Sequence, residues 1–226
     1  MNPIYLLTLG RYYQKYGDQQ KSISVLEEAE RLDPDFPEIH YSLAVSYFIA
    51  DDFETAAKLL ERAMRLDPKF DRAVFLLGSV RATEAKFAEA ERLLTLALEL
   101  QPQNPYYHVV FGMTLVTENR LTEAEEQFKK TLELKPCYAL AHFQMGRVFT
   151  RTGRQEEAVR ELETAVNLQP NLLEAHYLLG HTYYRIGEKG KGDKELAKFQ
   201  QYRAAEYSER QGLLREVQRA VRDQSP

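Results

Sequence analysis

The chain has 226 residues, of which 44% are hydrophobic and 28% charged, with 30 Lys and Arg against 34 Asp and Glu. This composition excludes disordered and collagen-like chains, and the net charge of −4 argues against a nucleic-acid binder. No uncharged stretch is long enough for a membrane-spanning helix, no secretory signal is recognisable, and one cysteine excludes an intrachain disulfide framework. We therefore expect a cytoplasmic protein without membrane insertion.

Proline sets an internal period along the chain. Five prolines follow one another at intervals of 34 residues: Pro34, Pro68, Pro102, Pro136 and Pro170. Counting from Pro3 divides the sequence into six blocks of 34 residues: 3–36, 37–70, 71–104, 105–138, 139–172 and 173–206. A repeat of this length predicts a solenoid, in which each unit buries its apolar face against its neighbours.

Each block reads as two helices joined by a turn, with residues numbered from the first position of the block. Apolar residues recur at helical spacing, and position 32 is proline in five blocks, where it ends the second helix. Small residues at positions 8 and 20 let the two helices approach closely. The turn between them holds Gly17, Asp51, Ala85, Asn119, Gly153 and Gly187. All but alanine tolerate the left-handed conformation that closes a helix, so the predicted fold class is all-α.

This pattern resembles the tetratricopeptide repeat family over residues 3–206, through the period, the small positions 8 and 20, Ala at 27 and Pro at 32. The resemblance implies a right-handed α-α superhelix whose first helices line a concave groove for peptides or partner proteins. Position 4, often tryptophan in the family, holds Leu6, His40, Val74, His108, His142 and His176. The last block also departs, with Phe199 and Ala204 where Ala and Pro are expected.

The family geometry directs positions 2, 5, 9, 12 and 13 of each first helix into the groove. The predicted partner-binding residues are Tyr41, Phe48, Phe75, Tyr106, Met113, Phe143, Arg147, Arg151, Tyr177, His181, Tyr184 and Arg185. Basic residues at these positions (Arg11, Lys15, Arg72, Arg147, Arg151 and Arg185) outnumber the acidic Glu38 and Glu174. We expect a partner segment with aromatic or aliphatic residues and an acidic group. In the alternative reading, the aromatic rings pack between hairpins and the arginines only solvate the surface.

The two ends of the array carry apolar residues of their own. Residues 207–226 have a stripe of Leu214, Val217 and Val221, which predicts a capping helix or, alternatively, a docking helix for another domain or subunit. The first helix is apolar around most of its circumference, so we expect an upstream segment, a partner or a second copy to cover it. A homo-oligomer would form through either end.

Three patterns suggest chemistry, and each has a simpler structural explanation. Histidines at position 4 of successive repeats lie about one helix diameter, roughly 10 Å, apart, which is too far for a shared metal; packed histidines with a satisfied nitrogen are the better account. Cys137 precedes His142 but occupies a variable junction loop. The glycine-rich run 187–194 lacks the Lys-Ser/Thr pair and the preceding strand of a phosphate loop. We predict no cofactor, no metal site and no catalytic residue.

The predicted function is therefore a non-catalytic scaffold for protein–protein interaction that binds a peptide or partner segment in its groove. Two alternatives stay open. The chain is a structural module that assembles with itself, or it is an accessory domain of a larger protein.

Overall fold

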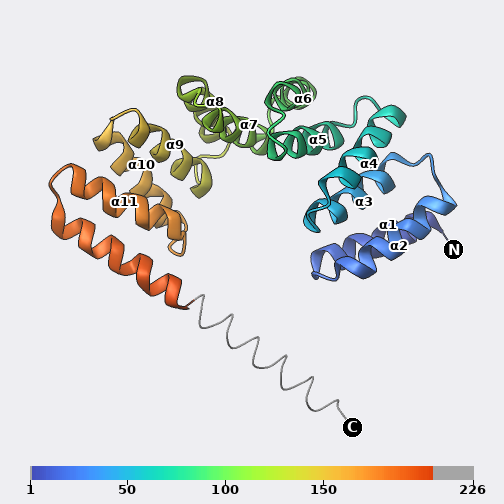
Figure 1. Cartoon of the computed structure of the whole chain (residues 1–226), viewed down its shortest axis with the longest axis horizontal. Coiled ribbons are helices and arrows are strands. Elements are labelled where there is room, and N and C mark those ends of the chain that lie inside the picture. The colour runs from blue at the N-terminus through green and yellow to red at the C-terminus, as the bar shows by residue number, and fades with distance from the viewer. Residues whose placement is uncertain (1, 206–226) are drawn as a thin grey trace, which may run out of the picture. The chain divides into compact units, whose positions relative to one another are not determined.

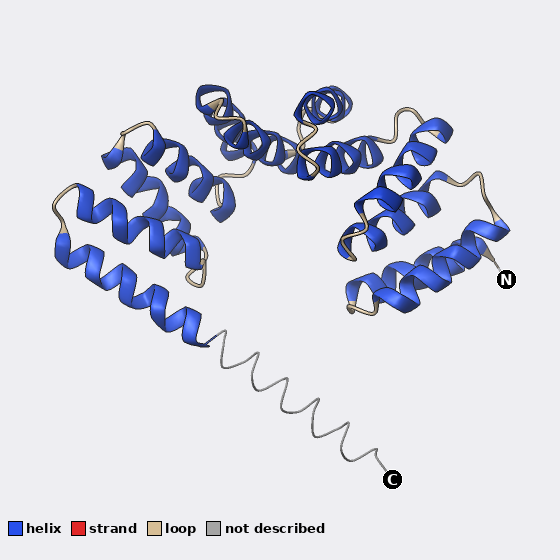
Figure 2. Cartoon of the chain, viewed as in Figure 1, coloured by secondary structure: helices blue, strands red, loops and turns tan. Residues whose placement is uncertain are grey.

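A computed structural model describes residues 2–205. These residues form helices joined by short connections, with no strand among them (Figure 2). The described residues divide into two compact units, 2–119 and 120–205. The predicted all-α fold class is confirmed, and its twelve helices fit about six helical hairpins.

The first unit contains seven helices, labelled in Figure 1: α1 (Pro3–Lys15), α2 (Gln19–Leu32), α3 (Pro37–Ile49), α4 (Phe53–Leu66), α5 (Asp71–Thr83), α6 (Phe87–Leu100) and α7 (Pro105–Thr117). Helices α1 and α2, α3 and α4, and α5 and α6 pack as pairs, and α2, α4 and α6 each contact the helix that follows. This second set of contacts stacks each pair on the next and creates a continuous core.

The second unit contains α8 (Leu121–Leu134), α9 (Ala139–Arg151), α10 (Gln155–Leu168) and α11 (Leu173–Arg185). A twelfth helix covers residues 189–205, where the described part ends. Helix α9 packs against both α8 and α10, and α10 packs against α11. This last helix has no junction proline and includes Ala204 and Ala205. The predicted capping helix, residues 207–226, lies outside the described residues.

Hydrogen bonds and backbone angles mark the ends of the helices. The Asn2 side chain accepts a hydrogen bond from the Ile4 backbone N–H at 2.8 Å, with Pro3 in the first turn of α1. The six turn residues between paired helices all have positive φ. Ala85 is among them, at φ 59°, although a Cβ disfavours this conformation.

The small residue at position 8 makes room for a leucine of the paired helix. A Cβ added at Gly10 would lie 2.4 Å from Leu26 Cγ, and one added at Gly146 would lie 2.6 Å from Leu162 Cγ. Both leucines occupy position 24 and are completely buried. The sequence correctly predicted that the two helices approach closely at the small positions 8 and 20. The structure adds that the leucine at position 24 fills the space beside position 8.

Candidate partner-binding site

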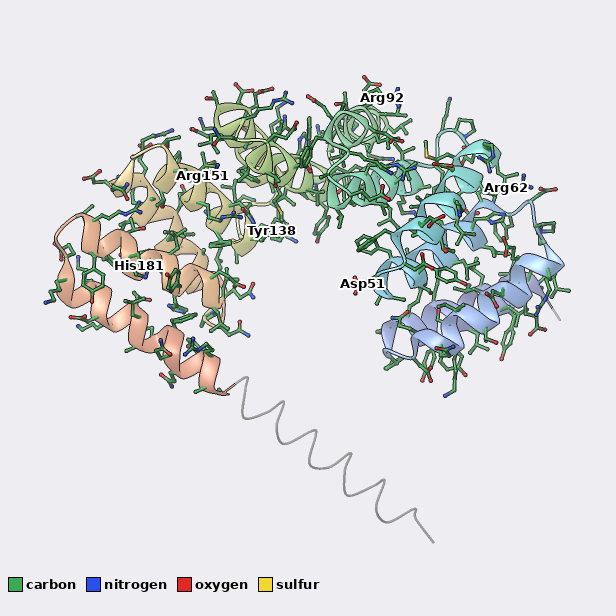
Figure 3. The ribbon with its side chains drawn as sticks, viewed as in Figure 1. Asp51, Arg62, Arg92, Tyr138, Arg151 and His181 are labelled. Atoms are coloured by element: carbon green, nitrogen blue, oxygen red, sulfur yellow. The ribbon has the colours of Figure 1, made fainter. Side chains whose placement is uncertain are left out.

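The residues predicted to bind a partner fall into two sets, one in each unit. Figure 3 labels two members of the second set, Arg151 on α9 and His181 on α11. The first unit holds Tyr41, Phe48, Phe75, Tyr106 and Met113. The second unit holds Phe143, Arg147, Arg151, Tyr177, His181, Tyr184 and Arg185.

Helix α11 presents the most open group of these residues. Tyr177, His181, Tyr184 and Arg185, with Leu178, line a hollow of about 450 Å³. The ring centroids of Tyr177 and His181 lie 4.4 Å apart in an edge-to-face arrangement, and Tyr177 is 49% exposed. Exposed aromatic rings beside a cation can bind an apolar or acidic group, so this hollow has the predicted chemistry.

The twelfth helix supports one side of this hollow. The Phe199 ring lies 5.4 Å from the Tyr177 ring, and the Tyr184 hydroxyl donates a hydrogen bond to the Asp193 carboxylate. That bond raises the pKa of Tyr184, with desolvation as the next cause. In the sequence, Phe199 stands out only as a departure from the family pattern at position 27. Its contact with Tyr177 makes it a candidate site residue that the sequence did not assign.

Helix α9 contributes two arginines, four residues apart on one helical face. Arg147 donates a hydrogen bond to Gln144 at 2.7 Å, and its guanidinium lies 5.8 Å from the Phe143 ring centre. Burial and the neighbouring charge of Arg151 lower the pKa of Arg147. Arg151 is more exposed and occupies the same repeat position as Arg185 in α11. The second unit therefore carries three cations on the first-helix face predicted to bind a partner.

Phe143, predicted as an anchor for the partner, is only 8% exposed. Its ring belongs to the core cluster that contains Leu162 and Leu179. It therefore offers a partner little surface, and its visible role is to pack the second unit and to support Arg147.

In the first unit, several predicted groove residues contact one another and their neighbours. The Phe75 ring stacks on the Tyr107 ring at 4.2 Å, and the Tyr107 hydroxyl donates to Asp71 at 2.5 Å. The Tyr41 ring lies 5.2 Å from the Phe70 ring, and Arg72 lies over both. Desolvation raises the pKa of Tyr41. These contacts match the alternative reading, in which aromatic residues pack between hairpins.

The remaining members of the first set differ in exposure. Phe48 and Met113 are half-buried, whereas Tyr106 is 50% exposed. Phe48 contacts the Phe53 ring at 5.6 Å. Tyr106, at the start of α7, is therefore the member of this set with the most surface to offer a partner.

Arg11, at the same repeat position as Arg147, is held by a neighbouring first helix. Its Nε donates to the Ser42 hydroxyl at 3.0 Å, while the neighbouring Gln14 side chain donates to the Ser42 carbonyl and the Ser46 hydroxyl. Burial, followed by the charge of Arg72, lowers the pKa of Arg11. The basic residues of this face therefore also connect adjacent hairpins.

The position-4 histidines have the structural role that the sequence predicted. Each places Nε2 2.7–3.0 Å from the carbonyl oxygen of the proline six residues earlier. In the second unit, Nδ1 of His142 and of His176 also contacts Glu161 and Glu195, at 2.7 and 2.6 Å. The histidines thus link the start of four first helices, α3, α7, α9 and α11, to the segment that follows the preceding helix.

The other chemical patterns give no site within residues 2–205. No group of three or more His, Cys, Asp or Glu side chains in this range is arranged to hold a metal ion. Cys137 is exposed, in the loop that precedes α9. Within the same range, none of the helices combines the length and the hydropathy needed to cross a bilayer.

Two profiles of one repeat family match the sequence. The profile described as "TPR repeat" matches residues 10–49 and 146–187, and the one described as "Tetratricopeptide repeat" matches residues 47–109. Together they cover more than half of the 226 residues. The chain belongs to the tetratricopeptide repeat family, as its residue pattern predicted. No curated protein sequence matches the chain.

Solved structures with the same fold include three of different origin. A chain of the APC/C hetero-tetramer Cut9–Hcn1 matches with a TM-score of 0.80 and 18% identity over 89% of this chain, which spans 40% of that chain. PilF of Pseudomonas aeruginosa matches with a TM-score of 0.78 and 17% identity, covering 90% of this chain and 97% of its own. YrrB, described as a TPR protein with an unusual peptide-binding site, matches at 0.62 and 21%, covering 78% and 91%. At these identities the likeness concerns the fold.

Proposed function

We propose that this chain is a non-catalytic scaffold that binds an extended peptide or a partner helix on the face formed by its first helices. Membership of a family whose members generally bind proteins or peptides supports the general function. The observation that carries the specific proposal is the exposed cluster of Tyr177, His181, Tyr184 and Arg185 around the hollow on α11. YrrB, which has a similar fold, is described as having a peptide-binding site.

The chemistry of the cluster defines the kind of segment that it accepts. The rings of Tyr177 and Tyr184 provide apolar contact area, and the Arg185 guanidinium can pair with a carboxylate. Arg151, at the equivalent position of α9, adds a second cation for the same segment. We expect a ligand with an aromatic or aliphatic side chain close to Asp, Glu or a free C-terminus.

A peptide display library, screened on the immobilised full chain, tests this proposal. Selected peptides should combine acidic and aromatic or aliphatic residues. Fluorescence anisotropy should show that the double variant Arg151→Glu with Arg185→Glu lowers the affinity for these peptides at least tenfold. The helical circular dichroism signal should not change. The matched control reverses two exposed arginines on second helices, Arg92→Glu with Arg160→Glu, and should retain binding. Equal loss in both double variants, or no loss in either, would contradict the assignment.

A further inference from the structure

The outer face of α1 is exposed at positions that are buried in every other repeat. Tyr5 is 60% and Tyr12 is 54% exposed, at positions 3 and 10 of the first block. In the other five blocks, the residues at these two positions are at most 5% exposed. They are Ile39, Ala73, Tyr107, Ala141 and Ala175 at position 3, and Ser46, Val80, Thr114, Val148 and Thr182 at position 10.

The second helix of the preceding repeat explains this burial. Helices α3, α5, α7, α9 and α11 each pack against the helix that comes before them in the chain. Within residues 2–205, α1 has no such helix. An end that faces water would carry polar residues, but Tyr5, Tyr12 and the adjoining Tyr16 are all more than half exposed. This surface therefore has the composition of a repeat junction.

A hydrogen bond between positions 11 and 25 marks three of the five junctions. The Tyr47 hydroxyl donates to Glu27 at 3.1 Å, where α3 meets α2. Arg81 donates to Glu61 at 2.7 Å, where α5 meets α4. At the junction of α11 with α10, the Tyr183 hydroxyl donates to Glu163. Desolvation and then this glutamate raise the pKa of both tyrosines.

The two remaining junctions have neither member of this pair. Position 11 is apolar there, as Leu115 and Phe149, and both side chains are buried. Position 25 of the preceding repeat holds Thr95 and Lys129. At every junction where position 11 carries a hydrogen-bond donor, position 25 of the covering helix is therefore a glutamate.

Helix α1 carries a donor at position 11 without its glutamate. The Tyr13 hydroxyl has no hydrogen-bond partner among residues 2–205. The helix also contains Arg11 and Lys15 and no acidic residue. Arg11 and Lys15 occupy groove positions 9 and 13, so the unpaired hydroxyl of Tyr13 is the feature of the outer face that favours a glutamate on the covering helix.

We propose that the outer face of α1, formed by Tyr5, Tyr12 and Tyr13 with the adjoining Tyr16, docks an amphipathic helix of another protein. That helix presents a glutamate to the Tyr13 hydroxyl and small or aliphatic residues to Tyr5 and Tyr12. Tyr107 shows that a tyrosine fits at such a junction. It occupies position 3 of its repeat, lies buried, and shares a core cluster with Leu93 and Ala97 of α6.

A second copy of the chain is a poorer occupant. The twelfth helix would have to cover α1 in a head-to-tail contact, but its position 25 is Ala197. A symmetric contact between two α1 helices would also bring no glutamate to Tyr13, because α1 contains no acidic residue. Neither arrangement supplies the glutamate that Tyr13 lacks.

The chain's own second helices supply defined probes for this surface. Peptides of α2, α4 and α10 carry Glu27, Glu61 and Glu163 at position 25, whereas peptides of α6 and α8 carry Thr95 and Lys129. Each peptide is held helical by a lactam bridge on its solvent side, because helices of this length are marginal alone in water. Binding to the full chain is measured by fluorescence anisotropy.

The three glutamate peptides should bind about tenfold more tightly than the other two, and glutamate-to-glutamine versions should lose this advantage. Tyr13→Phe should also remove the advantage, and Tyr5→Ser with Tyr12→Ser should abolish binding of all five. A control outside both proposed surfaces, Leu168→Ser at the exposed end of α10, should leave binding unchanged. All four substituted positions of the chain are partly or largely exposed, so unchanged circular dichroism spectra should verify that the variants fold.

Three results would overturn the proposal. In the first, no peptide binds, or the glutamate peptides have no advantage. In the second, the advantage survives in Tyr13→Phe. In the third, sedimentation velocity shows a dimer of the unmodified chain that Tyr5→Ser with Tyr12→Ser dissociates, which would assign the surface to a second copy.

Discussion

Tyr41 and Phe75 in the first unit occupy the same repeat position as Tyr177 in the second unit, yet their surroundings differ. Tyr41 packs against Phe70 under Arg72, and Phe75 stacks on Tyr107, so both contact residues at the next junction or in the next repeat. Within residues 2–205, no first helix follows α11, and Tyr177 is half exposed beside a hollow. A repeat position therefore defines the direction of a side chain, while the neighbouring repeat determines whether it packs or remains open to a partner.

Substitution of the two rings by alanine should separate these roles. Phe75→Ala removes a stacked, half-buried ring and should lower the free energy of unfolding by about 3 kcal/mol, near the lower end for a core aromatic residue. Tyr177→Ala removes an exposed ring and should cost less than about 1 kcal/mol. Urea denaturation, followed by circular dichroism, measures both values. Similar losses for the two variants would contradict the distinction between a packed and an open position 5.

The contact within each hairpin should, in contrast, be the same in both units. Gly10→Ala and Gly146→Ala each place a Cβ within 2.6 Å of a leucine Cγ. Each should lower the free energy of unfolding by about 2 kcal/mol, because neither buried leucine can move away without disturbing the core. The control is Thr8→Ala, on the exposed side of α1. Gly17→Ala is unsuitable as a control because Gly17 has a positive φ. A loss in one unit alone would show that the hairpins differ more than their sequences indicate.

The turn between paired helices holds an alanine in one hairpin of the first unit and a glycine at the same position in the second unit. Ala85 in the first unit has φ 59°, and Gly153 in the second has φ 79° with no atom within 4 Å of an added Cβ. Ala85→Gly should raise the free energy of unfolding by up to about 1 kcal/mol, because relief of the left-handed strain exceeds the entropy that glycine adds to the unfolded chain. Gly153→Ala should have the opposite effect. Thermal unfolding measures both, and a shift of the same sign in the two variants would contradict this explanation.

The sequence predicted the fold well because its signals are local and periodic. Junction prolines, turn residues and small residues each act within one hairpin, so they identify the helices without knowledge of the neighbours. The candidate site was harder, since the exposure of a position-5 side chain depends on the following repeat. Phe143 and Tyr177 have the same position and similar chemistry, but Phe143 lies in a core cluster. The pairs of positions 11 and 25 were missed because their members are 20 residues apart and belong to different repeats.

The smallest expected change in the free energy of unfolding concerns the hydrogen bonds of the position-4 histidines. The pH dependence of this contribution can be tested at His142. Burial lowers the pKa of His142, but hydrogen bonds to Glu161 and to the Pro136 carbonyl outweigh burial and raise it. A raised pKa in the folded state means that the protonated imidazole interacts more favourably with the folded chain than with the unfolded chain. Its stabilising contribution is complete below the unfolded value near 6.5 and is lost as pH rises through the folded value.

Glu161→Gln should therefore destabilise the chain by less than about 1 kcal/mol near pH 5.5, and by a smaller amount near pH 8.5. Urea denaturation at the two pH values measures the difference. Glu133→Gln, which replaces an exposed glutamate of α8, is the control and should show no such difference. An equal loss at both pH values would mean that Glu161 stabilises the neutral imidazole equally well, so that the link between α9 and α10 depends on geometry and not on charge.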